Sequence, residues 1–374
     1  MSLINDLPQI VNRNFAAFEE EVAKDTILQE LNAYFPQALS PLIASHLQLE
    51  EELSIDCEKI LHGNSTDAES EQQLQRVLEQ IQDKATYVKK LALTLVGNGF
   101  NTELNLKSCV RLFETVSQHC SRLSNLTIRG YTIPVSALRP IIFCQKLHTL
   151  NLRIGIFTSW GKHISIPEYR DQQEKTMTKD KQGEIGKLLA QFSRLTQLEA
   201  QGLIDNDIKI ITKQLPLLTQ LRLANSSAMT KKSMKYIATL THLTDFSFGS
   251  TEMEMGHFSF LQPLAQSLQN LSLEQGEQLQ RLGPLAQLQT LTLNRVTTAD
   301  LTWILVNCPA LKELHLKPFN NRDLTLSSLL TLKSHTQLQK IKVDSFNQVF
   351  REELELLKPS FPAKCCLEVS QNDY

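Results

Sequence analysis

The sequence lacks the motifs that most often mark an enzyme. Its 13 glycines are spread over 374 residues, and they form no phosphate-binding loop. It has no H-E-x-x-H or C-x-x-C pair, no nucleophile elbow and no kinase signature. We therefore predict a protein without catalytic activity, metal or cofactor. An enzyme whose site is assembled from residues of several repeats is the alternative that the sequence leaves open.

Long apolar runs and a surplus of charge of either sign are also missing. No stretch approaches the roughly 18 apolar residues that span a bilayer. The opening MSLINDLPQIVNRNF has no basic start followed by an apolar run, so it does not resemble a secretory signal. Net charge is −2, and the mixture of signs argues against a coherent basic groove for nucleic acid. We expect a protein of a cytoplasm that neither spans a membrane nor binds nucleic acid.

The chain does contain a recurring L-x-x-L-x-L motif. The residues before Cys308 show helical spacing, because Leu301, Ile304 and Leu305 recur at i, i+3 and i+4. From Leu311 the period changes to two, as in a strand with one buried face. The first residue of the motif, which we call the opening residue, is Val88, Leu123, Leu147, Leu195, Leu218, Leu243, Leu268, Leu288, Leu311 and Leu338 in successive repeats, with a degenerate copy at Lys364.

The intervals between these opening residues are typical of a leucine-rich repeat. Eight of the ten lie between 20 and 27 residues. A helix followed by a short strand, repeated in this way, predicts an α/β right-handed leucine-rich-repeat solenoid, or horseshoe, with a concave parallel sheet. The expected solenoid covers residues 65–374 and has about eleven repeats.

Two intervals are longer than the others. The first, from Val88 to Leu123, indicates a longer helix around Cys109–Cys120. The second, from Leu147 to Leu195, is twice the usual length and includes an aromatic and polar segment at about 154–186. This segment is either a loop inserted on one face or a degenerate repeat with a strand at Ile164 and Ile166.

Residues 1–64 do not carry the repeat. Apolar spacing predicts helices ending before Pro36, over Leu39–His62 and again over Asp67–Lys84. We expect 1–64 to be an N-terminal helical domain or a cap on the solenoid core.

Two of the repeats carry a family resemblance. The runs His119–Ile128 and Asn307–Leu316 resemble the ribonuclease-inhibitor and cysteine-containing classes of leucine-rich repeat. These classes include the substrate-recognition arms of F-box proteins, and the likeness covers about residues 85–370. The irregular, Gln- and Lys-rich repeats also resemble those of Legionella leucine-rich-repeat effectors. An F-box would precede the repeats in one subclass, and Thr26–Pro36 is similar to part of it, but no tryptophan occurs before Trp160.

The cysteines are interpreted as packing residues. Cys120, Cys144 and Cys308 each stand three residues before an opening leucine, where sister repeats have leucine or alanine. Free cysteine behaves as a small apolar side chain in such a position. Cys365 and Cys366, adjacent in a predicted strand, should point to opposite faces.

Counted from the opening residue of each repeat, the third, fifth and seventh positions should face the concave side, because they alternate with the buried leucines. This face begins basic, becomes acidic in the middle and is basic again at its end. One interpretation is electrostatic complementarity to a folded protein; the other is a solvated face on which Glu199, Arg222 and Asp245 satisfy one another. The predicted partner-binding residues are Arg129, Arg153, Trp160, Tyr169, Glu199, Arg222, Asp245, Glu274, Glu313, His315, Lys317, Lys340 and Lys342.

The predicted function is non-catalytic binding of a protein partner by an adaptor or a bacterial effector, the latter acting in a host cytoplasm. The alternative is an F-box-like substrate receptor of a ubiquitin ligase. The identity of the partner and the oligomeric state are not specified by the sequence.

Overall fold

A computed structural model describes most of the chain from Glu52 onward, which forms one compact unit. The described residues are 52–57, 67–85, 87–95, 102–157, 183–224, 229–249, 255–274, 276–317, 324–345 and 348–371. The N-terminal helices predicted before Glu52, and both aromatic residues of the long segment, Trp160 and Tyr169, lie outside them.

A single parallel sheet runs through this unit in sequence order. Every strand pairs with the strands before and after it, so the order is β1 to β12 without a crossover. The strands are β1 Glu52–Asp56, β2 Lys90–Leu95, β3 Asn125–Pro134, β4 Thr149–Phe157, β5 Gln197–Gln201, β6 Gln220–Ala224, β7 Asp245–Gly249, β8 Asn270–Leu273, β9 Thr290–Leu293, β10 Glu313–Leu316, β11 Lys340–Ser345 and β12 Cys366–Gln371.

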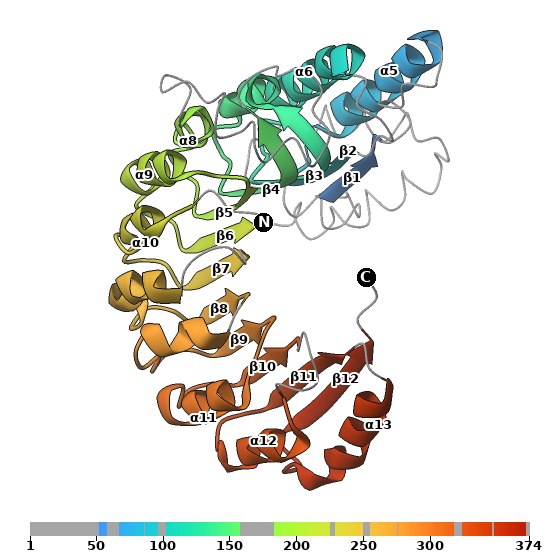
Figure 1. The fold of residues 1–374 in the computed structure, drawn as a ribbon. Coiled ribbons are helices and arrows are strands. Elements are labelled where there is room, and N and C mark those ends of the chain that lie inside the picture. The colour runs from blue at the N-terminus through green and yellow to red at the C-terminus, as the bar shows by residue number, and fades with distance from the viewer. Residues whose placement is uncertain are drawn as a thin grey trace, which may run out of the picture. The chain divides into compact units, whose positions relative to one another are not determined.

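Helical segments connect successive strands and form the outer layer, while the strands form the inner one (Figure 1). They are α5 Asp67–Lys84, α6 Thr102–His119, η1 Val135–Phe143, α8 Glu184–Leu189, α9 Asp205–Gln214, α10 Lys231–Ile237, η3 Met255–Leu264, η4 Gly276–Arg281, α11 Thr298–Asn307, α12 Leu326–Thr331, η5 Leu332–Ser334, α13 Gln348–Leu357 and η6 Lys358–Ser360, where η marks a 3₁₀ helix. This two-layer arrangement is a leucine-rich-repeat solenoid, as the repeat pattern predicted. No helix among the described residues is long and apolar enough to cross a bilayer.

All eleven predicted strands are present at the predicted positions. Each begins two residues after its opening residue, from Lys90 after Val88 to Cys366 after Lys364. The helix expected over Asp67–Lys84 is confirmed as α5, and the longer helix of the first wide interval is α6.

One predicted helix is wrong in part. Glu52–Asp56, within the helix expected over Leu39–His62, forms β1 and pairs in register with β2. Leu53, Ile55 and Cys57 alternate with exposed residues, which is the period of a strand. The opening position of this repeat is Glu50 instead of leucine, so the L-x-x-L-x-L pattern missed it. The sheet therefore contains a twelfth strand before the first predicted one.

The core lies between the two layers and consists mainly of leucine. The second and fourth residues of each strand point into it, and the slot three residues before each opening residue holds a buried side chain, which is cysteine, leucine or alanine in most repeats and Phe192, His335 or Phe361 in the others. Cys120, Cys144 and Cys308 are all buried, as are Leu215 and Leu240 in the same slot, so the packing interpretation is confirmed.

Buried carboxylates accept hydrogen bonds from backbone N–H groups at the helix starts, and one of them also connects two neighbouring repeats. The Asp207 carboxylate accepts hydrogen bonds from the backbone N–H groups of Ile204, at the start of α9, and Gly186, in α8. Thr297 and Asp300 form a capping box at the start of α11, where Thr297 N donates to Asp300 Oδ2 at 2.8 Å. These bonds satisfy backbone donors that the first helical turn leaves open.

The long interval between β4 and β5 adds no strand between them. Thr149 pairs with Gln197 and Leu150 with Leu198, so the two strands are direct neighbours. The alternative of a degenerate repeat depends on a strand at Ile164 and Ile166, and both residues lie outside the described part of the chain, as does the whole of 158–182.

Candidate functional site

The exposed side of the sheet carries most of the predicted site residues. In the strand pairs the third and fifth positions lie opposite their equivalents in the next repeat, for example Glu313 opposite Lys340 and His315 opposite Lys342. Apart from the buried Thr149, these positions are half-buried or exposed, whereas the positions between them are buried. We call this surface the concave face. It consists of the third, fifth and seventh positions of each repeat, counted from the opening residue, on the twelve strands.

Two ion pairs join four of the predicted residues across β4 to β7. Arg153 Nε lies 2.8 Å from Glu199 Oε1, and Arg222 Nη2 lies 3.3 Å from Asp245 Oδ2. Both pairs are diagonal, connecting positions two residues apart in register, which long side chains can bridge. Glu199 and Arg222 lie directly opposite each other but form no ion pair. Each of these four charges is therefore neutralised by a side chain of a neighbouring strand.

A second charged cluster lies on β10 to β12 and is centred on Asp344. Its carboxylate is only 7% exposed, accepts a hydrogen bond from Ser370 Oγ, and lies 2.6 Å from His315 Nε2 and 3.3 Å from Lys342 Nζ. Burial alone would raise the pKa of Asp344, but the hydrogen bonds from Ser370 and His315 and the nearby positive charge outweigh it and lower that pKa. The carboxylate is therefore ionised at neutral pH.

His315 is neutral at the same pH. Burial lowers its pKa below the usual value, and the lysines at positions 342 and 317 lower it further, while the bond to Asp344 acts in the opposite direction. A neutral imidazole that donates from Nε2 to Asp344 fits this geometry. The contact is then a hydrogen bond rather than a full ion pair.

The cluster contains a serine, an aspartate and a histidine, but not in a catalytic order. Ser370 donates to Asp344 instead of to His315, so the hydroxyl contacts a carboxylate of lowered pKa, which is a weak base, and not the imidazole. Within the described part of the chain, no three His, Cys, Asp or Glu side chains converge on a possible metal position.

The remaining predicted residues differ in what they contact. Glu274 Oε2 accepts from Asn294 Nδ2 at 2.9 Å, and Lys340 Nζ lies 2.9 Å from Glu368 Oε1. The charged groups of Arg129 and Lys317 form no ion pair with any described residue. Among the cations of the predicted partner-binding residues, these two, on β3 and directly after β10, are the ones whose charge is not neutralised by a described neighbour.

Three residues of the face belong to the charged clusters although the sequence did not single them out. They are Asp344, Glu368 and Ser370. Their positions follow from the register, since Lys340 lies opposite Cys366 and Lys342 opposite Glu368. The prediction took only Lys340 and Lys342 from the last two strands, whereas a search for opposite charges on diagonal positions would have found the pair Lys340–Glu368.

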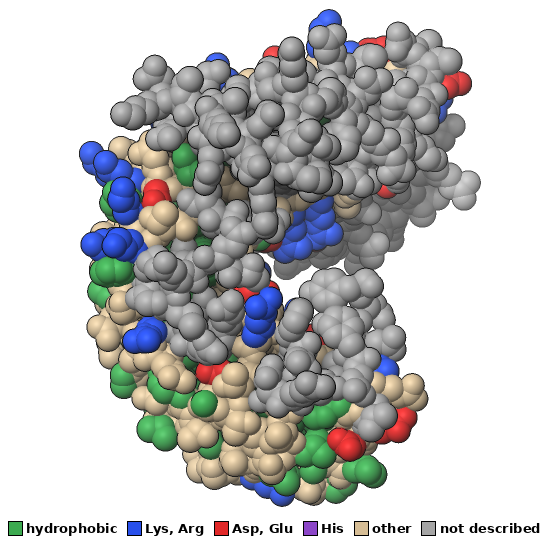
Figure 2. All heavy atoms as spheres, viewed as in Figure 1, with side chains coloured by type: hydrophobic (Ala, Val, Ile, Leu, Met, Phe, Trp, Pro, Cys, Tyr) green, Lys and Arg blue, Asp and Glu red, His purple; other side chains and the backbone are tan. Residues whose placement is uncertain are grey.

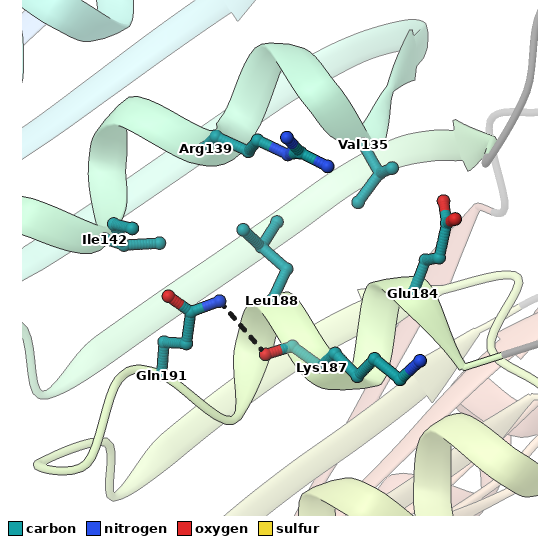
Figure 3. Close-up of a pocket in the computed structure, with 7 residues that line it drawn as sticks. All are labelled: Val135, Arg139, Ile142, Glu184, Lys187, Leu188 and Gln191. Atoms are coloured by element: carbon teal, nitrogen blue, oxygen red, sulfur yellow. Dashed lines mark hydrogen bonds between the residues drawn. The ribbon is translucent and has the colours of Figure 1, made fainter. Parts of the chain in front are cut away.

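A concavity in the outer layer lies between η1 and α8 (Figure 3). Its volume is about 410 Å³, within the size range of small-molecule pockets. Leu188 extends from α8 toward η1, which contributes Arg139. The pocket is lined by Val135, Arg139, Ile142, Glu184, Lys187, Leu188 and Gln191.

The seven cysteines divide into six buried thiols and one exposed thiol, Cys366. Burial raises the pKa of Cys57, Cys109, Cys144 and Cys308 to about 12, which makes them poor nucleophiles. Cys365 is buried and Cys366 is exposed, as expected for neighbours on a strand.

We expect a thiol reagent such as Ellman's reagent to label a single cysteine in the native protein. Cys366 should react rapidly, and the other six should react only after denaturation, because reaction needs an accessible thiolate. The Cys366→Ser variant should show no rapid phase. A second fast-reacting thiol in the native protein would contradict the packing role of the buried cysteines.

Comparisons with known proteins identify no family for this chain. No protein-family model and no curated protein matches it. Among solved structures it is similar to the leucine-rich-repeat-containing protein LegL7 from Legionella pneumophila, at 16% identity and a TM-score of 0.46, over 86% of this chain and 91% of that one. It is also similar to a chain of the Rad7 and Elc1 complex of yeast, at 14% identity and a TM-score of 0.38, over 88% of this chain and 96% of that one. The assignment of the fold rests on the sheet order and the register described above.

Proposed function

We propose that this chain is a non-catalytic protein-binding scaffold that recognises a folded protein through its concave face. The observation that supports this most directly is the continuous row of polar side chains on twelve parallel strands. Most of these side chains lie outside the core and are available for contacts, whereas Thr149 and Asp344 are buried. Their charges vary along the row, which gives a pattern that a complementary surface can match.

The ion pairs on the face are compatible with binding. The arginine side chains of the two pairs, Arg153 and Arg222, are 43% and 42% exposed, whereas their carboxylate partners are only 16% and 19% exposed. A carboxylate of a partner protein can therefore approach either guanidinium from its exposed side. Arg129 and Lys317 form no such internal pair with a described residue.

A charge-swap variant tests the face without disrupting its internal pairing. In this variant, Arg222→Asp is combined with Asp245→Arg, and Arg153→Glu with Glu199→Arg. The fold and the net charge should be unchanged, whereas the recovery of the bound protein from a cytosolic lysate should fall by about tenfold or more, because like charges meet at the interface. Quantitative mass spectrometry of the recovered proteins measures this.

The matched control is a swap in the outer layer. Lys358 Nζ and Glu355 Oε2 lie 2.5 Å apart at the end of α13, so exchanging them repeats the same chemistry away from the concave face. Recovery should be unaffected by this exchange. Equal recovery by both swap variants would exclude the concave face as the binding surface.

The biological setting that we propose is that of an adaptor or effector acting in a cytoplasm. The F-box-like alternative depends on residues 1–64, of which only Glu52–Cys57 are described, and these belong to the sheet strand β1 and its end. The full chain would recover the adaptor subunit of a ubiquitin ligase if that alternative held. We expect no such recovery.

A further inference from the structure

The outer layer carries a concentration of positive charge that the net charge of −2 conceals. Helices α8, α9 and α10 and the turns that follow them, residues 183–195, 204–217 and 229–242, contain three carboxylates and seven lysines and arginines. We call these seven residues the basic ridge. They are Lys187, Arg194, Lys209, Lys213, Lys231, Lys232 and Lys235, and all are exposed.

Helical spacing places these cations on the outward side. In α9 the residues Ile208 and Ile211 pack into the core, so Lys209 and Lys213, four residues apart, face solvent. In α10, Met234 and Ile237 are buried, and all three lysines of the helix are exposed. Figure 2 shows Lys and Arg side chains gathered along one edge of the molecule, over these helices.

Nothing in the described part of the chain neutralises the ridge by direct contact. None of the seven cations forms an ion pair with a described carboxylate, although Lys235 Nζ lies 4.7 Å from the centre of the Phe260 ring. Two of the three nearby carboxylates are engaged inside the layer. Asp207 accepts from backbone N–H groups, and Asp205 accepts from Ser233 Oγ at 2.5 Å and Thr230 Oγ1 at 2.6 Å.

The three helices are close enough to act as one charged surface. α9 packs against both α8 and α10, and packed helices lie about 8–10 Å apart. The Debye length is about 10 Å at 0.1 M salt, so the fields of neighbouring helices add. The next helical segment along the stack, η3, has no charged residue, so the ridge ends at α10 on that side.

Exposed apolar side chains accompany the positive charge. Leu217 is 59% exposed in the turn after α9, and it occupies the position that Arg194 holds one repeat earlier and Lys146 two repeats earlier, directly before the opening leucine. Thr219 N donates to Thr196 O immediately after these turns, which confirms that the turns of Arg194 and Leu217 are neighbours. Phe143, which is 67% exposed, lies three residues before Lys146.

We propose that the basic ridge docks this protein onto an anionic phospholipid surface. Clusters of four to eight Lys and Arg bind acidic headgroups, and exposed leucine or phenylalanine enters the boundary with the acyl chains. Six of the seven ridge cations are lysines, and the one aromatic ring within helices α8 to α10, that of Tyr236, is half-buried against the core. Sites for nucleic acid combine arginine with aromatic stacking, so the ridge fits a lipid surface better.

The test is co-sedimentation of the full chain with phosphatidylcholine vesicles that contain about 30% phosphatidylserine, compared with pure phosphatidylcholine vesicles at the same ionic strength. The wild-type protein should bind only the anionic vesicles. The triple variant Lys209→Gln, Lys213→Gln, Lys235→Gln should bind on the order of a hundredfold more weakly, since each lysine near such a surface contributes roughly fivefold.

The matched control changes three exposed lysines outside the ridge, Lys312, Lys333 and Lys364, to glutamine, with the same loss of net charge. Its binding should stay within about threefold of the wild-type protein, since these lysines do not face the same surface. Equal loss in both triple variants would overturn the assignment to the ridge. Failure of the wild-type protein to bind anionic vesicles would overturn the proposal itself, whatever the concave-face experiment shows.

Two further measurements distinguish a lipid surface from other anions. The Leu217→Ser variant should bind anionic vesicles severalfold more weakly, because its side chain no longer enters the apolar boundary, and should bind heparin as the wild-type protein does. Tighter binding of the wild-type protein to duplex RNA or to a polyglutamate peptide than to the vesicles would assign the ridge to a nucleic acid or an acidic protein instead. Urea unfolding midpoints equal to wild type confirm that each variant folds.

Discussion

Replacing Gly130 by alanine is expected to destabilise the solenoid by at least about 3 kcal/mol, through backbone strain and steric overlap together. Gly130 lies in β3 with a φ of +145°, a conformation that side-chain-bearing residues rarely adopt. An added Cβ would overlap the carbonyl oxygen of Leu95 and lie 2.7 Å from its carbonyl carbon. Because these are backbone atoms of the neighbouring strand, no side-chain movement relieves the overlap.

Gly202 provides the matched control. It also has a positive φ, +66°, but an added Cβ would meet no atom within 4 Å. Gly202→Ala should therefore cost only about 1–2 kcal/mol, the penalty of the left-handed conformation. Urea denaturation of both variants gives the two free energies of unfolding. Similar values for the two substitutions would contradict the close approach of β3 to β2.

The same substitution should also affect the concave face. The register between β3 and β4 shifts between Arg129 and Thr132, next to Gly130, and Arg129 is one of the two predicted anchors without a described ion pair. A shift of this backbone moves the Arg129 guanidinium. If Arg129 contacts the partner, Gly130→Ala should weaken binding under conditions in which the variant is still folded.

The second large effect is expected at Phe246, where Phe246→Ala should cost about 3–5 kcal/mol because it leaves a cavity in the core. Phe246 is fully buried on β7 and its ring stacks on Phe248 at 6.3 Å. Phe248 in turn meets Phe258 of η3 edge to face at 5.6 Å. In a repeat array each unit is stabilised mainly by its neighbours, so a cavity here weakens the contacts with both β6 and β8.

The adjacent repeats provide the control for this substitution. Leu221 and Leu271 hold the positions opposite Phe246, so Phe246→Leu gives the side chain that the two neighbouring strands already use. It should cost less than about 1.5 kcal/mol. Chemical denaturation followed by circular dichroism measures both. Equal destabilisation by leucine and alanine would mean that the ring stacking, rather than the filled volume, stabilises this repeat.

Much of the fold could be predicted from the sequence because the spacing of apolar residues within each repeat indicates where its helix and its strand lie. The alternation around Leu311, Leu314 and Leu316 fixes a strand and its buried face without reference to any other part of the chain. The comparison of Cys308 with Leu215 and Leu240 likewise identified a packing slot. Local pattern failed at β1, where Glu50 replaces the opening leucine and the short alternating run was taken for part of a helix.

The candidate site was predictable as a face but not as a set of contacts. Alternation places Arg153, Glu199 and Arg222 on one side of the sheet, yet it does not say which carboxylate each arginine meets. That choice depends on side-chain reach across a diagonal of the register, and the structure resolves it as Arg153 with Glu199 and Arg222 with Asp245. Asp344 illustrates the same point, since its three partners come from three different strands.

The sequence by itself determined the repeat, the positions of eleven strands and the division of each strand into buried and exposed residues, since these depend on spacing along the chain. Only the tertiary structure decided how charge is distributed over the surface. Stacking the repeats brings the lysines of α9 and α10 to one outward side, whereas total composition averages them with distant carboxylates such as those of α5 and α13. An electrostatic field depends on distances in space, and those distances exist only once the solenoid has formed.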